Sequence, residues 1–403
     1  MLLFFCRIVL IVKVRRFRYN NKAKEFYGVF RLGKAEGSLE IDVIIPVYKP
    51  GRELLVLLKR LAGQTMPVHK IILMNTEEKY YRELIDKTGE DPAKIFDNVE
   101  VHHLAKKDFD HGGTRHKAVQ YSQADIFVLM TQDAMPADQY LIEELTVHLR
   151  AGLEEERQSR KEQAQKRRGA PGQEKTEKHQ EGSAQEEQER QRVQPKQRVR
   201  VAAAYGRQLP GEDSSESEKI SRYFNYPKKS RIKTAADLNT MGIKTFFCSN
   251  VCAAYRRDLY EESGGFVRHT IFNEDMIYAS GAVKAGYGIA YEAKAQVIHS
   301  HNYTNMQQLR RNFDLGVSQA EHPEVFAGVP SESEGKRLVK AAFRYLKRKG
   351  RLYRFPGFCV QCAFKYAGYK LGKNYKKLPK KWVTALTAGK DYWKQEEVVC
   401  VES

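Results

Sequence analysis

Cysteines are scarce in this sequence, which limits the classes of protein that it can encode. Only six of the 403 residues are cysteines, and they are widely scattered. This excludes a disulfide framework and favours a reducing cytoplasm. Cys359 and Cys362 have the spacing of a redox or metal motif, but no second pair or nearby histidine completes a four-ligand site. Two buried cysteines on an amphipathic helix are the simpler interpretation.

Long apolar runs are also absent. No stretch approaches the roughly 18 to 20 uninterrupted apolar residues that cross a bilayer. The closest, Leu2 to Val12, is interrupted by Arg7 and followed by several basic residues. We interpret residues 1–39 as a basic and apolar segment that packs or lies at an interface, with membrane insertion as the alternative.

Acids are rare near the C-terminus. From Lys336 to Lys394 there are eighteen Lys or Arg residues against one acid, Asp391, within a chain whose formal charge is +19. The basic residues are interleaved with aromatic ones such as Tyr353. We therefore expect residues 331–403 to form a basic helical extension, peripheral to an anionic membrane surface at the inner face of the cell membrane. A solvated extension without a partner is the alternative.

Residues 151–200 contain almost no apolar side chains. The segment is rich in Glu, Gln, Lys and Arg, has no aromatic residue, and offers only Leu153, Val193 and Val199 as branched apolar residues. Such a composition cannot offset the entropy lost on ordering. We expect a polar insertion that is disordered or partly helical, and we do not expect function there.

Between these segments, short apolar runs alternate with amphipathic stretches. This alternation predicts an α/β domain over residues 40–330, with right-handed crossovers and a mostly parallel sheet. The predicted strands are Ile41–Val47, Lys70–Asn75, Val99–Leu104, Asp125–Thr131, Val201–Pro210 and a pair within Gly286–His299. Predicted helices are Glu77–Asp86, His111–Ser122, Ala137–Arg150 and one that follows Asn250 and runs through Leu259.

Two acidic segments about 140 residues apart point to catalysis. Thr131-Gln132-Asp133-Ala134 ends an apolar strand, and Asn273-Glu274-Asp275-Met276 follows much later. One carboxylate can hold a metal-diphosphate while the other deprotonates a hydroxyl. The pattern indicates a transferase that uses a nucleotide sugar.

With four further motifs, these segments resemble family-2 glycosyltransferases of the GT-A fold, and specifically the bacterial rhamnosyltransferase branch. The matching pieces occur in the family's order within about residues 40–325 and are Ile44–Tyr48, Phe109–Arg115, Thr131–Ala134, Tyr205–Pro210, Asn273–Met276 and His299–Tyr303. The resemblance implies inverting transfer of a sugar, with L-rhamnose from dTDP-rhamnose expected. The implied acceptor is a cell-surface polysaccharide or a lipid-linked saccharide.

The resemblance also implies a divalent metal, Mg²⁺ or Mn²⁺, because the leaving diphosphate must be neutralised. Asp133 falls at the family's D-x-D motif, where Thr131 and Gln132 replace the other two positions. His299 and His301 lie two apart on a strand and so share a face, and either could complete the metal shell. A helix cap for Asp133 and structural roles for both histidines are the alternatives.

For the acceptor side, the resemblance implies that Asp275 is the general base and that Glu274 can bind an acceptor hydroxyl. Two helix-terminal acids that interact with the helix dipole are the alternative. Arg207, Gln208 and Asn250 are candidates for acceptor contacts, unless they only make loop and cap hydrogen bonds.

For the donor side, a glycine-containing segment opens a helix, where free amides favour an anion. A plain glycine turn is the alternative. Asn75 stands where the family usually has an acid for the base. An Asn side chain can still hydrogen-bond a pyrimidine edge, so we expect dTDP, with UDP as the alternative. The residues expected to contact the nucleotide sugar are Pro46, Val47, Tyr48, Asn75, His111, Gly112, Gly113, Arg115, Gln132 and Asp133.

Two rival classes remain. The positive charge would suit a nucleic-acid-binding protein, but no recognised motif for it is present and the basic residues lie outside the predicted core, so nucleic acid is not the expected partner. The incomplete metal motif would also suit a non-catalytic scaffold in polysaccharide synthesis. Within the enzyme class, another transferase with a UDP-sugar donor is the alternative.

Overall fold

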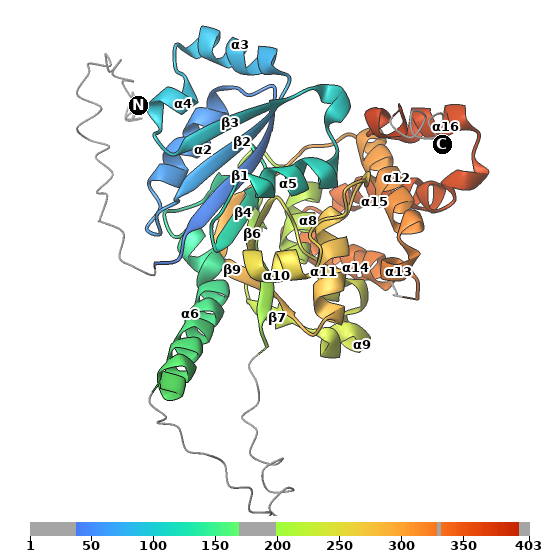
Figure 1. Cartoon of the computed structure of the whole chain (residues 1–403). Coiled ribbons are helices and arrows are strands. Elements are labelled where there is room, and N and C mark those ends of the chain that lie inside the picture. The colour runs from blue at the N-terminus through green and yellow to red at the C-terminus, as the bar shows by residue number, and fades with distance from the viewer. Residues whose placement is uncertain (1–37, 169–198, 329–331, 395–403) are drawn as a thin grey trace, which may run out of the picture. The chain divides into compact units, whose positions relative to one another are not determined.

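The computed structural model describes residues 38–168, 199–328 and 332–394 (Figure 1). The predicted N-terminal apolar segment lies outside them. The strands are β1 (Ile41–Tyr48), β2 (Lys70–Thr76), β3 (Val99–Leu104), β4 (Ile126–Met130), β5 (Met135–Pro136), β6 (Val201–Leu209), β7 (Arg231–Lys233), β8 (Cys252–Arg256) and β9 (Gly288–Ile298). The helices are α2 (Arg52–Ala62), α3 (Glu78–Thr88), α4 (Pro92–Ile95), α5 (His111–Gln120), α6 (Leu141–Arg168), α8 (Glu216–Asn225), α9 (Leu238–Met241), α10 (Arg257–Glu262), α11 (Glu274–Lys284), α12 (Asn305–Glu321), α13 (Pro323–Phe326), α14 (Glu332–Arg348), α15 (Phe355–Lys373) and α16 (Lys380–Leu386).

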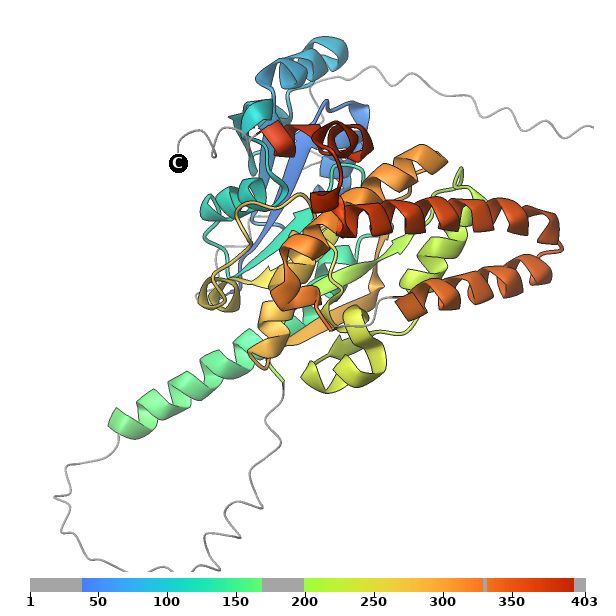
Figure 2. The ribbon, with the colours of Figure 1, turned by 90° about the vertical axis from the view of Figure 1, so that its right-hand side faces the viewer.

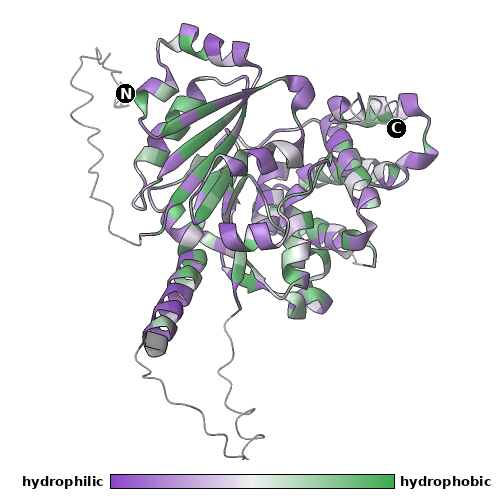
Figure 3. Ribbon diagram, viewed as in Figure 1, coloured by the Kyte–Doolittle hydropathy of each residue, from purple (hydrophilic) through white to green (hydrophobic). Residues whose placement is uncertain are grey.

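The strands form one nine-stranded sheet in the order β3-β2-β1-β4-β8-β6-β9-β5, with β7 paired to β9. Strands β1 to β4 are parallel to one another, and β8 runs against both β4 and β6. Because β9 is parallel to β6, six of the nine described strands point the same way. Apolar residues concentrate in these strands, whereas α6 is mostly hydrophilic (Figure 3). The predicted α/β architecture with a mostly parallel sheet is confirmed.

Two predicted elements are wrong in the second half of the domain. The chain after Asn250 forms the fully buried strand β8, and helix α10 begins only at Arg257. The region from Gly286 to His299 holds one long strand instead of a pair. A register shift against β6 between Gly206 and Arg207 makes this strand irregular, and a bulge of this kind blurs the alternation that sequence reasoning uses.

Helix α6 continues past its predicted end at Arg150. Residues 151–168 of the insertion, which was expected to be disordered or partly helical, are therefore helical. Ion pairs and the buried side chain of Leu153 hold this part to the sheet. The carboxylate of Glu156 accepts hydrogen bonds from Arg200 and from the fully buried Arg256, at 3.0 and 2.9 Å respectively. Arg157 Nη2 donates to Asp125 Oδ1 at 2.6 Å. Residues 169–198 lie outside the described residues.

The C-terminal helices pack on the α/β domain, so residue 331 is not a structural boundary. Figure 2 shows α15 alongside α12. Val383 of α16 joins a buried cluster with Phe313 and Val317 of α12. Asp314 of α12 accepts hydrogen bonds from Thr387 Oγ1 and from the amides of Ala388 and Gly389, at 2.6, 2.9 and 3.1 Å.

Glycines let α12 and α15 approach closely. A Cβ atom on Gly368 would lie 2.1 Å from the carbonyl oxygen of Leu309, and one on Gly372 would lie 2.0 Å from that of Phe313. Real Cβ atoms do not come this near to backbone oxygens, so any side chain at either position would push the helices apart.

We predict that Gly372→Ala destabilises the protein by about 1–3 kcal/mol, because the added methyl group meets backbone that cannot rotate away. Gly357→Ala in the same helix is the matched control, since nothing lies within 4 Å of its added Cβ. That control should stabilise by up to about 1 kcal/mol through helix propensity. Chemical denaturation measures both, and equal effects would contradict the glycine contact.

Candidate active site

A pocket of about 1430 Å³ brings the two acidic segments together. Asp133 reaches it from the loop after β4, and Glu274 and Asp275 reach it from the first turn of α11. His299 and His301 line it from the segment that follows β9. The prediction that Asp133 and Asp275 share one cavity is confirmed.

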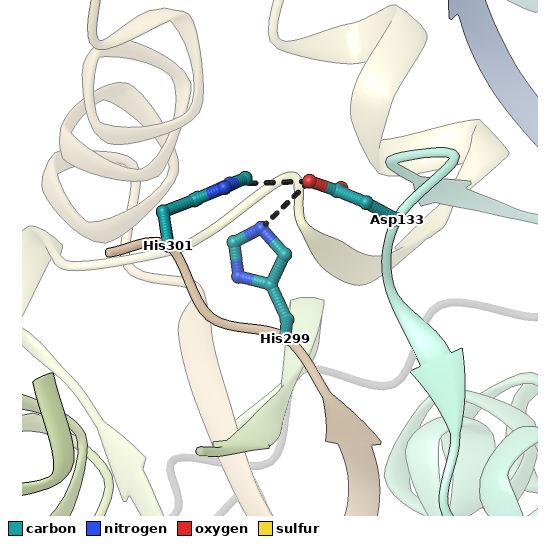
Figure 4. A group of neighbouring side chains, drawn as sticks. All are labelled: Asp133, His299 and His301. Carbon is teal, nitrogen blue, oxygen red and sulfur yellow. Dashed lines mark ion pairs between the residues drawn. The ribbon is translucent and has the colours of Figure 1, made fainter. Parts of the chain in front are cut away.

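Asp133, His299 and His301 converge on one point (Figure 4). Asp133 Oδ2 lies 3.1 Å from Nε2 of His301 and 3.5 Å from Nε2 of His299. Their potential ligand atoms all lie within 4.8 Å of one another. His299 is 7% exposed and His301 is 34% exposed, so the cluster opens on the side of His301. One carboxylate and two imidazoles in this arrangement form a donor set that fits a divalent cation.

The contacts of His299 strengthen that fit. Its Nδ1 lies 3.1 Å from Gln208 Oε1, which can only accept, so Nδ1 carries the hydrogen. In neutral His299 the Nε2 lone pair then faces the carboxylate of Asp133, and this contact is favourable with a metal cation between the two atoms or with a proton on Nε2. Burial lowers the pKa of His299, although Asp133 opposes the effect, so protonation of the ring is disfavoured. Burial would raise the pKa of Asp133, but the two histidines outweigh it and hold that pKa below its ordinary value.

Backbone amides and Asn250 fix the acids of α11. The two carboxylate oxygens of Asp275 accept from the amides of Asn250 and Met276, at 3.0 and 2.7 Å. Glu274 Oε1 accepts from Asn250 Nδ2 at 3.1 Å and lies 3.3 Å from Arg115 Nη1. Both members of this last pair are buried, so Glu274 is held as a charged partner of Arg115.

The adjacent acids differ in protonation. Burial and then the neighbouring Glu274 carboxylate raise the pKa of Asp275 to about 7. Burial would also raise the pKa of Glu274, but Arg115 and then His111, which both line the pocket, outweigh it and lower that pKa. One acid therefore stays ionised while its neighbour exchanges a proton near neutrality, which is the pattern of a general base.

The three residues expected at the acceptor have other contacts. The side-chain amide of Asn250 donates to Glu274 through Nδ2, and its Oδ1 accepts from the hydroxyl of Tyr255 at 2.6 Å. Gln208 lies behind His299. Arg207 Nε donates to a backbone carbonyl at 3.2 Å, and its side chain is not part of the pocket wall. Asn250 and Gln208 thus support the two charged clusters.

The two glycines in the first turn of α5 allow close packing of the chain. A Cβ on Gly112 would lie 1.9 Å from the carbonyl oxygen of Val267, and one on Gly113 would lie 2.7 Å from that of Arg268. The amide of Gly113 is already bonded to Asp110 Oδ1 at 2.6 Å. Protein backbone therefore lies close to both glycines and a carboxylate caps the helix terminus, while Gly113 also lines a second, smaller pocket. The expectation that this pair lets a phosphate approach stays a prediction.

On the expected nucleotide side, Pro46 and Val47 belong to β1 and pair with Met74 and Asn75 of β2. Gln132 joins the ends of β1 and β4, since its amide accepts from the nitrogen of Tyr48 at 3.0 Å and donates to the oxygen of Tyr48 at 2.9 Å. The ring of Tyr48 is 39% exposed and contacts the edge of another tyrosine, Tyr80, with ring centroids 5.4 Å apart.

Asn75 has an unusual environment. It is fully buried, and its Nδ2 lies 3.2 Å from the oxygen of Glu77 and 2.9 Å from Nδ1 of His103. Its Oδ1 finds no hydrogen-bond donor among the described residues. A buried acceptor without a donor is costly, and Asn75 is not among the residues that line the large pocket. A second pocket of about 260 Å³ is lined by His103 beside it.

Sequence reasoning missed the far wall of the large pocket. Residues of α8, α12, α14 and α15 form it, among them Arg222, Arg311, Leu338, Val339, Lys365, Tyr366 and Tyr369. No motif marks these residues, because helix packing alone brings them beside the acids. The basic and aromatic composition of the C-terminal region was the one available signal.

Comparison with known proteins identifies the family. The model for "Glycosyl transferase family 2" matches residues 42–153. The O-antigen chain rhamnosyltransferase RfbN of Salmonella typhimurium is 33% identical over 359 residues, which are 88% of this chain and 96% of that protein. The O-antigen chain rhamnosyltransferase WbaN of Salmonella anatum is 32% identical over 317 residues, 77% of this chain and 85% of that protein.

Solved structures show weaker likenesses to this chain. A mannosyltransferase of Pyrobaculum calidifontis, in complex with GDP-Man and Mn²⁺, covers 93% of both chains at 13% identity and a TM-score of 0.42. The S. aureus protein TarS (residues 1–349), in complex with UDP-GlcNAc, covers 84% of this chain and 92% of its own at 11% identity, also with a TM-score of 0.42. At scores this low, no chemistry is transferred from either structure.

The two curated relatives exceed 30% identity over most of their own length, which establishes the family without the weaker likenesses. The sheet order agrees with the GT-A fold that the resemblance implied. The chain belongs to the family-2 glycosyltransferases, in the rhamnosyltransferase branch.

Proposed function

We propose that this enzyme transfers L-rhamnose from dTDP-rhamnose, with inversion, onto a saccharide of a cell-surface polysaccharide. The shared pocket of Asp133 and Asp275 carries the proposal, since inversion needs charge neutralisation and a base on opposite sides of one carbon. The names of both curated relatives, O-antigen chain rhamnosyltransferases, support the choice of sugar and acceptor class.

In the proposed reaction, Asp275 takes the proton of the acceptor hydroxyl as its oxygen attacks the anomeric carbon. The bond from that carbon to the diphosphate oxygen breaks on the opposite side. Asp133, His299 and His301 would hold a divalent ion, which supplies positive charge to the departing diphosphate when it is bound. Arg115 keeps Glu274 ionised, and that charge raises the proton affinity of Asp275.

The choice of dTDP follows from the resemblance to the rhamnosyltransferase branch and from the names of the two curated relatives. Asn75 adds no selection between bases, because it is fully buried and lines neither pocket. A UDP-sugar donor is the alternative, and a panel of nucleotide sugars tests it. We expect consumption of dTDP-rhamnose and not of UDP-sugars.

We predict that Asp275→Asn lowers the transfer rate by about 10²–10⁴-fold while nucleotide affinity stays nearly unchanged, because the amide cannot accept the proton. In the wild type, kcat should fall about tenfold per pH unit below pH 7, since the raised pKa makes the carboxyl neutral there. Asp97→Asn, at an exposed position after α4, is the control. Unchanged turnover in Asp275→Asn would remove this residue from the base role.

We predict that Mn²⁺ supports transfer better than Mg²⁺, because two imidazoles and one carboxylate suit the softer ion. Asp133→Ala should weaken both transfer and nucleotide binding in Mn²⁺. Assays with chelator, then with each ion added back, measure the preference. Full activity in chelator would refute the metal role.

A lipid-linked acceptor would bring the enzyme to the inner face of the cell membrane, as a cytoplasmic peripheral protein. The end of α14 and the turn that follows it support this proposal, because they expose aromatic and aliphatic side chains among cations. Tyr353 is 72% exposed, and Phe343 and Leu352 are exposed nearby, beside Lys347, Arg348 and Lys349. None of the helices in the described part of the chain is long and apolar enough to cross a bilayer.

We predict that replacing Lys347, Arg348 and Lys349 together by Gln weakens binding to anionic vesicles by about 100-fold, at on the order of 1 kcal/mol per basic residue. The same change at the exposed Lys79, Lys87 and Lys94 of α3 and α4 is the control. Co-sedimentation with phosphatidylglycerol vesicles measures both variants. Equal binding by the two would count against this surface.

A further inference from the structure

We propose that Gln208 is a positioning residue for the metal ligand His299, and not an acceptor contact. The proposal rests on the metal site proposed above, because it concerns how the protein prepares that site. The buried side-chain amide of Gln208 contacts His299 in the pocket wall, Arg222 of α8 and Ser249 before β8.

Every polar atom of the Gln208 side chain is engaged. Its Oε1 accepts from Nδ1 of His299 at 3.1 Å and from Nη1 of Arg222, and its Nε2 donates to Ser249 Oγ at 3.0 Å. Because a guanidinium can only donate, the atom that faces Arg222 must be the amide oxygen. The same oxygen faces His299, which assigns the hydrogen of that ring to Nδ1 and leaves Nε2 free toward Asp133.

The supporting elements are rigid. Gln208 is 2% exposed and lies in β6, where it pairs with Val297 of β9. The next pair, Leu209 with Ile298, is the last of the two strands. The amide of His299 continues this ladder by donating to the oxygen of Leu209 at 3.0 Å. Arg222 is fixed in turn, since its Nε donates to Glu218 Oε1 within α8 at 2.6 Å. The amide therefore cannot turn without breaking several bonds.

His301 differs in this respect. Its Nε2 also faces Asp133, but within the described part of the chain no hydrogen bond is found for its Nδ1, and the ring is more exposed. The two histidines are thus unequal: the ring of His299 is fixed in advance by Gln208, whereas the ring of His301 can adjust. Partners behind a ligand commonly set the tautomer and orientation of a histidine that binds metal.

The test measures the binding of Mn²⁺ alone to the full-length protein. The electron paramagnetic resonance signal of the free ion reports how much Mn²⁺ stays unbound. Gln208→Met keeps the volume and removes the acceptor, and it should weaken Mn²⁺ binding by about 10–100-fold. Gln208→Glu keeps an acceptor for Nδ1–H and should bind within a few fold of wild type. Gln319→Leu, another buried pocket amide, loses its bond to Tyr369 without touching the histidines and should bind normally.

The outcomes separate this role from the site itself. If Asp133→Ala leaves Mn²⁺ affinity unchanged, the proposed metal site fails. If Asp133→Ala weakens binding and Gln208→Met does not, only the role of Gln208 is overturned, and a raised acceptor KM in Gln208→Met would return it to acceptor binding.

A spectrum of the wild-type protein tests the same point without relying on a folded variant of Gln208. In ¹⁵N-histidine spectra assigned with His299→Gln, neutral His299 should carry its hydrogen on Nδ1. A hydrogen on Nε2 would contradict the inference, whatever the variants show.

Discussion

The placement of β8 between β4 and β6 is the constraint on which the active site depends. It brings the end of β4, with Asp133, to the same edge of the sheet as the ends of β6 and β9, with Gln208 and His299. Ser249 and Asn250, which precede β8, reach that edge from the opposite direction. Ligands of open α/β sheets commonly bind at the carboxyl ends of the strands, where neighbouring side chains converge without a long loop.

Electrostatic compensation then divides the pocket into two halves. On one side a carboxylate meets two imidazoles, so negative charge is balanced by groups that can also bind metal. On the other side two carboxylates share one guanidinium, Arg115, and the imbalance leaves Asp275 as the acid that holds its proton more tightly. The same physical rule, that a buried charge needs a partner, gives opposite protonation preferences to Asp133 and Asp275.

The sequence was most informative for features that short stretches of neighbouring residues determine. Strands β1, β2 and β4 were predicted because continuous apolar runs are typical of strands buried on both faces, and Asp133 and Asp275 were found through short motifs. Strand β8 was missed because alanines such as Ala253 and Ala254 favour a helix by their intrinsic propensity. Its identity comes from pairing with β4 and β6, which no local pattern records.

Roles were harder to predict than positions. Gln208 and Asn250 were recognised as site residues, but their hydrogen bonds to other protein groups depend on strand register and helix placement. Gly112 and Gly113 were recognised as special, yet the close neighbour is the backbone near Val267, far along the chain. A motif identifies which residues are constrained, while the three-dimensional contacts identify what constrains them.

The hydrogen bonds between Asp314 and residues 387–389 have a practical consequence. Ala388 and Gly389 are held by that carboxylate and also line the pocket of the two acids. A protein truncated at the apparent domain end near residue 331 would lose the part of the pocket wall that the C-terminal helices form. The minimal catalytic unit is therefore longer than its recognisable family motifs.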